Sequence, residues 1–254
     1  MRNAFFLMRL ILISACFFTN TVIAQQQAQV KKDNLKISFV NTIDKQLLQL
    51  DAAYTNCFNE TFTITKLKYY ISDVQLQTSN KKNTDFKSNY FLIDQEDSSS
   101  GNFSLMVANN TYTGISFLVG VDSLKNVSGA QSGSLDPLNG MFWTWSSGYI
   151  MFKIEGSSPQ SASINNKLEY HIGGFTGKQN VLRRVQLNFA VPVVITNAAL
   201  PTAIAISVEL NKIWNATHAL HIKQHPVCTT PGVLAANIAD NYAQLFSILK
   251  IITL

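Results

Sequence analysis

Histidine is the residue type whose chemistry is most informative in this chain, because the sequence contains only four. His171 lies in the alternating segment 168–172, which predicts a strand. His218, His221 and His225 lie close together near the C-terminal end. Neutral imidazole is a common metal ligand, so the four histidines are candidate metal ligands.

The spacing of the last three histidines does not by itself build one metal site. In a strand, His218 and His221 would face opposite sides of the sheet. His221 and His225 would share a face, but they would lie about 13 Å apart, whereas a His nitrogen binds a metal from about 2 Å. Two interpretations stay open: His171 joins one of them from a neighbouring strand, or all are ordinary surface or core histidines.

Trp143 and Trp145 are the aromatic candidates. In a strand, both indole rings would lie on the same face. One interpretation is that they are core residues that bury a large apolar area. The other is a functional role for the pair.

Cys57 and Cys228 are the cysteines that follow the N-terminal segment. Exported chains commonly join distant cysteines, and a bridge here would close a loop of about 170 residues. Thiolate metal ligands are the alternative, but no CxxC spacing supports them. The sequence therefore predicts a disulfide.

The sequence lacks the familiar motifs of enzymes and nucleotide-binding proteins. It contains no GxGxxG, P-loop, GxSxG or HExxH pattern. The formal charge of +5 is spread along the chain without a basic, aromatic stripe, which argues against a nucleic-acid partner. We expect a protein that is not an enzyme.

The first 24 residues are typical of a secretory signal peptide. Arg2 and Arg9 precede an apolar stretch, and Ala24 ends a cleavable segment. A spanning helix needs roughly 20 apolar residues, more than this stretch offers. Residues 13–16 resemble a lipobox, so a lipid anchor at Cys16 is the alternative. We expect a periplasmic protein with no transmembrane segment in the mature chain.

The remaining chain predicts one all-β domain, 25–254, with a short C-terminal α-helix. Hydrophobic residues make up 46% of the chain, enough for a sizeable core. We expect an antiparallel β-sandwich, with polar loops at 77–89 and 122–140 and a helix over 233–246. Period-two segments predict strands at 35–39, 62–76 with a bend near 69–71, 90–93, 113–121, 149–155, 168–172, 181–194 and 203–210.

Several of these segments together resemble the MbnP-like family of periplasmic proteins, which is associated with methanobactin and copper handling. The resemblance covers nearly all of the mature chain. The C-terminal helix expected here is similar to that of the subgroup common in Bacteroidetes. The motifs of the resemblance are Lys66 to Val74, Gly120-Val121-Asp122, Asn126, Leu135-Asp136-Pro137, Gly140 to Trp145, Gly148-Tyr149-Ile150, Tyr170 to Gly174 and Ile238 to Ala243.

The resemblance implies a β-sandwich that binds copper in the periplasm. In characterised relatives, a tryptophan is oxidised to kynurenine and joins histidines at the metal, and a di-haem peroxidase-like partner performs the oxidation. His171 matches the family's His-Gly motif, and Trp143 and Trp145 match its aromatic pair.

The chain departs from the copper-binding branch at two positions. Ser72 stands where that branch has a His, and a second His is missing near Val127. Three hypotheses follow: a copper-binding or copper-trafficking protein, a protein-interaction module with a degenerate metal site, or a redox partner of a di-haem peroxidase.

Overall fold

The computed structural model describes residues 32–80, 83–143, 148–196 and 202–252. The expected signal peptide (1–24), Cys16 and Trp145 lie outside these ranges. Residues 31–254 form one compact unit. Among the described helices, none has the length and apolar character needed to cross a bilayer.

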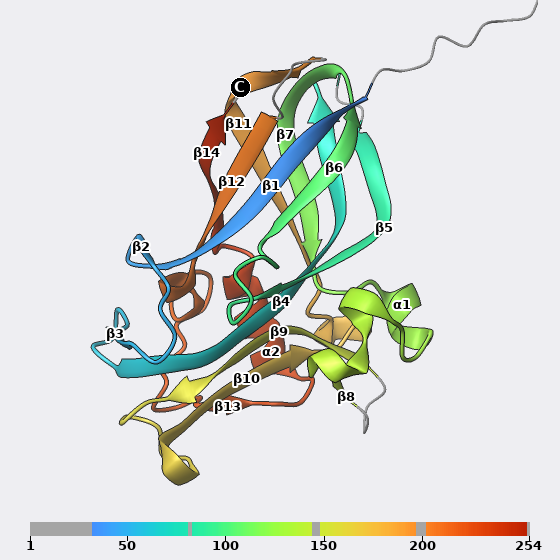
Figure 1. Cartoon of the computed structure of the whole chain (residues 1–254). Helices are drawn as coiled ribbons and strands as arrows, with labels where there is room; N and C mark the ends of the chain where they lie inside the picture. Colours follow the sequence, from blue (N-terminus) through green and yellow to red (C-terminus); the bar gives the residue numbers. More distant parts are fainter. Residues whose placement is uncertain (1–31, 81–82, 144–147, 197–201, 253–254) are drawn as a thin grey trace, which may run out of the picture. The chain divides into compact units, whose positions relative to one another are not determined.

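The described strands form two sheets (Figure 1). The smaller sheet has the order β14-β12-β1-β2, with β6 also paired to β1. Its strands are β1 (Lys32–Ile43), β2 (Gln46–Leu47), β6 (Asn102–Ala108), β12 (Thr202–Glu209) and β14 (Phe246–Ile252).

The larger sheet has the order β11-β7-β4-β9-β10-β13, with β3 and β5 paired to β4 and β8 paired to β9. Its strands are β3 (Ala53–Thr55), β4 (Thr61–Thr78), β5 (Asn83–Asp94), β7 (Asn110–Val119), β8 (Phe142–Trp143), β9 (Gly148–Ser157), β10 (Lys167–Gly173), β11 (Arg183–Ile195) and β13 (Val227–Cys228).

Aromatic side chains join the two sheets across the core. Phe39 of β1 packs edge-on against Phe117 of β7, with ring centroids 5.4 Å apart, and against Tyr69 of β4 at 6.4 Å. Phe246 of β14 packs edge-on against Phe117 at 5.2 Å. Since large aromatic rings bury much apolar area, these contacts fix how the sheets face each other.

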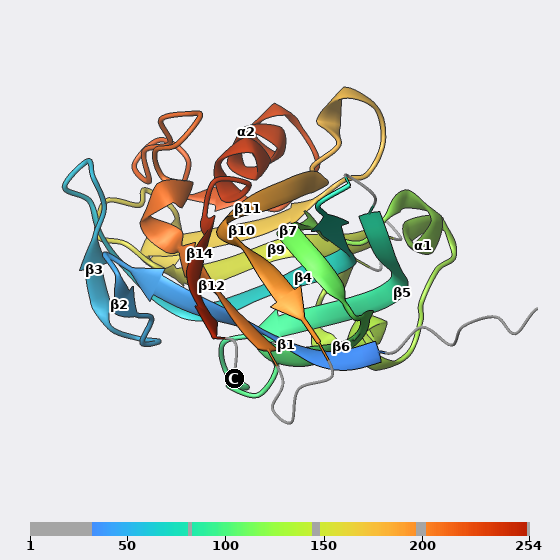
Figure 2. The ribbon, with the colours of Figure 1, turned by 90° about the horizontal axis from the view of Figure 1, so that it is seen from above.

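Short helical segments flank the sheets, and helix α2 packs on the larger one (Figure 2). Tyr242 of α2 stacks on Phe152 with centroids 5.1 Å apart. The helical segments are α1 (Ser123–Val127), α2 (Val233–Tyr242) and the 3₁₀ turns η1 (Gly133–Leu135), η2 (Pro137–Asn139), η3 (Ile164–Asn166), η4 (Gly177–Gln179) and η5 (Leu210–Ile213).

The predicted β-sandwich with a short C-terminal helix is confirmed. Two pairings are parallel, β1 with β12 and β10 with β13, in an otherwise antiparallel arrangement of the described strands. The bend predicted near 69–71 is a register shift between Ser72 and Val74, where Asp73 has a φ of 44°.

Three local predictions are wrong. The polar loop at 77–89 is largely strand, because polar residues from Asn83 onward form β5 at the side of β4. The loop at 122–140 contains α1, η1 and η2. The C-terminal helix ends at Tyr242, and Phe246 begins β14, where its ring packs in the core against Phe39 and Phe117 while the strand pairs with β12.

Glu60 is a buried carboxylate that ties the turn before β4 to a distant loop. It accepts hydrogen bonds from Asn56 Nδ2 at 2.8 Å and from the backbone N–H groups of Ile222 at 2.9 Å and Lys223 at 3.0 Å. Burial alone would raise its pKa, but these bonds more than offset burial and hold the pKa below its ordinary value.

We predict that Glu60→Gln lowers the free energy of unfolding at pH 7 by about 3 kcal/mol, because an amide nitrogen would face backbone N–H donors. A depressed carboxyl pKa contributes stability that is complete at neutral pH and is lost as pH falls below about 4.5. The variant should therefore lose less stability on acidification. Urea unfolding at several pH values measures both effects.

Glu96→Gln, at an exposed position, is the control. An unchanged urea midpoint in Glu60→Gln would contradict the assignment.

Candidate metal centre

His171 lies on the face of the larger sheet that is turned away from α2. Residues alternate along β10, so Tyr170 and Ile172 point into the core while Glu169 and His171 point outward. His171 is level with Lys153 of β9 in the strand register, and Glu169 is level with Glu155. The register thus brings three potential ligands from two strands together.

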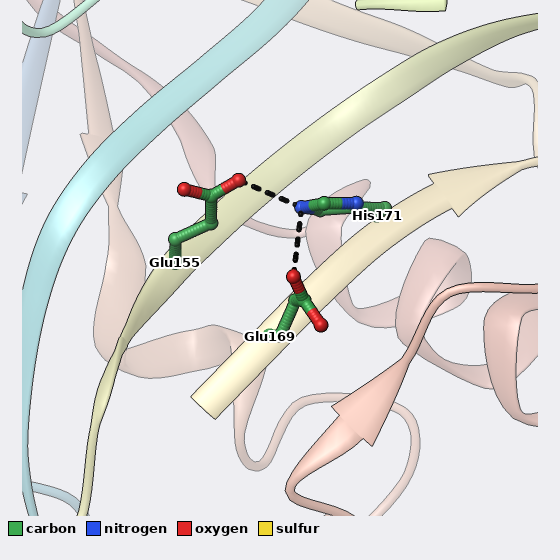
Figure 3. A group of neighbouring side chains, drawn as sticks. All are labelled: Glu155, Glu169 and His171. Atoms are coloured by element: carbon green, nitrogen blue, oxygen red, sulfur yellow. Dashed lines mark hydrogen bonds and ion pairs between the residues drawn. The ribbon is translucent and has the colours of Figure 1, made fainter. Parts of the chain in front are cut away.

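Glu155 and Glu169 both approach the same nitrogen of the His171 ring (Figure 3). His171 Nε2 is 2.8 Å from Glu155 Oε1 and 3.6 Å from Glu169 Oε1. Among the described residues, these three form the group whose ligand atoms lie within 4.8 Å of one another. The exposed fractions of the side chains are 17% for His171, 28% for Glu155 and 15% for Glu169, so the group is partly accessible to solvent.

Lysine ammonium groups surround the carboxylates. Lys153 Nζ is 3.5 Å from Glu155 Oε1, and Lys66 Nζ is 3.5 Å from Glu155 Oε2. Lys167 Nζ lies 2.7 Å from Glu169 Oε2. Lys153 also donates a 2.6 Å hydrogen bond to the carbonyl oxygen of Gly140.

The electrostatics keep His171 neutral and Glu155 ionised at neutral pH. Burial lowers the pKa of His171, and the charge of Lys153 lowers it further, against the opposing effect of Glu155. Burial would raise the pKa of Glu155, but the hydrogen bond with His171 and the charges of Lys153 and Lys66 hold the pKa below its ordinary value. Neutral imidazole and ionised carboxylate are the forms that bind metals.

The donor set fits a divalent ion of intermediate hardness. Ligand atoms about 2 Å from one ion lie roughly 3 to 4 Å apart, close to the separations of His171 Nε2 from the two carboxylates. One nitrogen and two oxygens suit Cu(II) or Zn(II). Cu(I) prefers sulfur, and the group contains no Cys or Met.

The structure does not bring the other predicted ligands to this group. His218 Nε2 is 3.0 Å from Asp240 Oδ2. His221 stacks on Phe58 with ring centroids 3.9 Å apart. The carbonyl oxygen of His225 accepts a 2.6 Å hydrogen bond from the Tyr170 hydroxyl. Each thus has a structural contact of its own among the described residues.

Trp143 is a buried residue whose ring lies against Gly173, the last residue of β10. It is 7% exposed. A Cβ atom built on Gly173 would lie 2.4 Å from Trp143 Cζ3 and 3.0 Å from the carbonyl oxygen of Tyr149. Gly173 therefore leaves room for the indole ring, which explains why β10 ends in a glycine. Trp145 lies outside the described residues.

The two positions at which the copper-binding branch has a histidine and this chain does not, Ser72 and the region of Val127, have different surroundings. Ser72 is fully buried, and its hydroxyl donates a 2.7 Å hydrogen bond to the carbonyl oxygen of Gly120. Val127 is 69% exposed on α1. The neighbouring Asn126 is structural, because its amide donates to Val121 O and its oxygen accepts from the N–H of Tyr149.

The predicted disulfide between Cys57 and Cys228 is wrong, because both cysteines are free. Cys57 is exposed in the turn before β4, where it lines a hollow with Lys45 and Lys212. Cys228 is buried in β13, level with Tyr170. One thiol faces solvent and the other faces the core. Burial raises the pKa of Cys228 to about 11, so this thiol stays protonated.

Sequence reasoning identified His171 but not its carboxylate partners. Glu169 precedes His171 by two residues in a predicted strand, a spacing that places both on one face. The sequence alone therefore indicates that Glu169 lies beside His171. Glu155 could not be placed in the same way, because its position beside His171 depends on the register between β9 and β10.

Comparisons with known proteins agree with this fold. The family model described as MbnP matches residues 32–230. The solved structure of MbnP from Methylosinus trichosporium is similar, with a TM-score of 0.56 and 16% sequence identity. The match covers 86% of this chain and 99% of that one. A search of curated protein sequences finds no match.

We predict that Glu155→Gln lowers the pKa of His171 further. The substitution removes a carboxylate that favours the charged imidazolium, while the effects of burial and Lys153 remain. NMR titration of the histidine ring protons measures the shift, with Glu96→Gln as the control. A pKa of His171 that rises or does not move in Glu155→Gln would show that the two side chains are not coupled.

We also predict that Gly173→Ala destabilises the protein by about 1–3 kcal/mol, because the added methyl group collides with Trp143. Urea unfolding measures the loss, and near-ultraviolet circular dichroism reports the changed packing of the indole. Gly232→Ala is the matched control, since a Cβ atom there meets no heavy atom within 4 Å. Equal unfolding midpoints for the two variants would count against the close contact.

Proposed function

Since the chain belongs to the MbnP family, we propose that it is an exported copper-binding or copper-trafficking protein that carries the ion without turnover. The observation that carries the proposal is the position of His171, a neutral imidazole between the carboxylates of Glu155 and Glu169. Copper is here the bound cargo, and these three residues would hold it.

The donor set favours Cu(II) over Cu(I). Imidazole nitrogen with carboxylate oxygen is a ligand combination typical of Cu(II), whereas Cu(I) is bound best by thiolate and thioether sulfur. Met151 of β9 offers no thioether to this group, because its side chain is buried and its Sδ lies 3.2 Å from the backbone N of Val121. The absent histidines at Ser72 and Val127 further separate this chain from the expected copper site.

We propose the periplasm as the compartment, because residues 1–24 are typical of a signal peptide. A lipid anchor at Cys16 is the alternative, and the intact mass of the native protein distinguishes the two. A di-haem peroxidase-like partner that oxidises a tryptophan remains a proposal from the family resemblance. The burial of Trp143 does not favour direct contact with such a partner.

A protein-interaction module is the second candidate function. The observation that favours it is the set of ammonium groups around Glu155, since Lys66 and Lys153 already balance its charge without a metal. In this case, partner binding would be unaffected by His171→Ala.

The test is isothermal titration of the purified protein with Cu(II), Cu(I) and Zn(II). We predict that Cu(II) binds with a Kd below about 1 μM, and that His171→Ala weakens binding by at least about tenfold. His218→Ala, which removes a histidine paired with Asp240, should leave the affinity unchanged. Absence of binding tighter than micromolar, or equal loss in both variants, would reject the copper proposal.

A further inference from the structure

We propose that Lys66 and Lys153 are internal competitors of the metal ion, and that they restrict the site to ions that bind imidazole strongly. The inference rests on the proposed function, because it concerns the selectivity of the same three ligands. Lys66 and Lys153 are not metal ligands, and the proposal gives their position beside Glu155 a role in metal selectivity.

The two lysines contact both oxygens of one ligand. Lys153 Nζ approaches Glu155 Oε1, the oxygen that also contacts His171 Nε2 at 2.8 Å. Lys66 Nζ approaches Glu155 Oε2 from β4, on the other side of β9. A cation that binds Glu155 must therefore replace or tolerate an ammonium group at either oxygen.

Lys153 cannot leave easily. Its side chain is 10% exposed, and its Nζ donates to the carbonyl oxygen of Gly140 at 2.6 Å. Lys66 is 34% exposed on β4 and can turn toward water. Lys153 is therefore a fixed positive charge beside the site, whereas Lys66 is a displaceable one.

A fixed positive charge has unequal effects on different metals. Mg²⁺, Ca²⁺ and Mn²⁺ bind mainly through carboxylate charge, which the lysines already compensate. Cu²⁺ and Zn²⁺ gain additional bonding from the imidazole of His171, which the lysines do not block. The lysines should therefore exclude hard cations while lowering the affinity for Cu²⁺ to a range that permits release.

The experiment compares metal binding by the wild-type full chain with that of Lys66→Met and Lys153→Met. Isothermal titration with Cu²⁺, Zn²⁺ and Mn²⁺ gives each affinity. We expect either substitution to tighten Cu²⁺ binding by about tenfold, because removing one nearby positive charge favours any cation. Mn²⁺ binding should tighten more, because Mn²⁺ depends mainly on the charge of the carboxylates. Lys66→Arg retains the charge and should behave as the wild type.

Lys178→Met is the matched control, since it removes one positive charge at an exposed position in η4. Lys66→Met covers the case in which loss of the buried Lys153 impairs folding. Wild-type binding of Cu²⁺ with no gain in either variant would overturn this inference alone. No binding in the wild type but clear binding in Lys66→Met would support the inference while rejecting native copper binding. No binding in any form would reject both.

Discussion

The alternation of side chains across strands β4, β9 and β10 is the constraint on which both the core and the candidate site depend. Inward residues such as Tyr69, Phe152 and Tyr170 are fully buried. The residues between them, including Lys153 and His171, necessarily point to the opposite face. A shift of one residue in register would put charged side chains into the aromatic core, so burial of the inner face fixes the position of the outer charges.

This constraint also determines which charges meet. Glu155 stands level with Lys66 of β4 on one side and with Glu169 of β10 on the other. Two carboxylates directly opposite each other repel, and such a pair is unfavourable unless cations lie nearby. Here the lysines and the His171 hydrogen bond supply the compensation. The same arrangement that makes the strand pairing stable thus places the candidate metal ligands next to positively charged side chains.

The sequence predicts the strands where one face is apolar and the other polar, as in the segment 62–76. It predicts less where local patterns mislead. Phe246 continues the helical spacing of α2, yet it packs against Phe39 and Phe117 as the start of β14. His171 could be identified from its strand and motif, but the approach of Glu155 needed the register between strands. The disulfide prediction is wrong because it rested on the presence of two distant cysteines in an exported chain, whereas Cys57 lies exposed in a turn and Cys228 faces the core.

The position of Ser72 separates the copper site that the family resemblance implies from the candidate ligand group at His171. In the strand register, His171 is level with Lys153, and Lys153 is level with Lys68 of β4. Ser72 lies four residues beyond Lys68, which is about 13 Å along the strand. The bulge after Ser72 interrupts pairing at that end of β4, and its hydroxyl is bonded within the core. A site near Ser72 and one at His171 would therefore use different parts of the same sheet. With serine at the first position, the second retains the imidazole, and the carboxylates beside it are Glu169 of the same strand and Glu155 of the neighbouring strand β9.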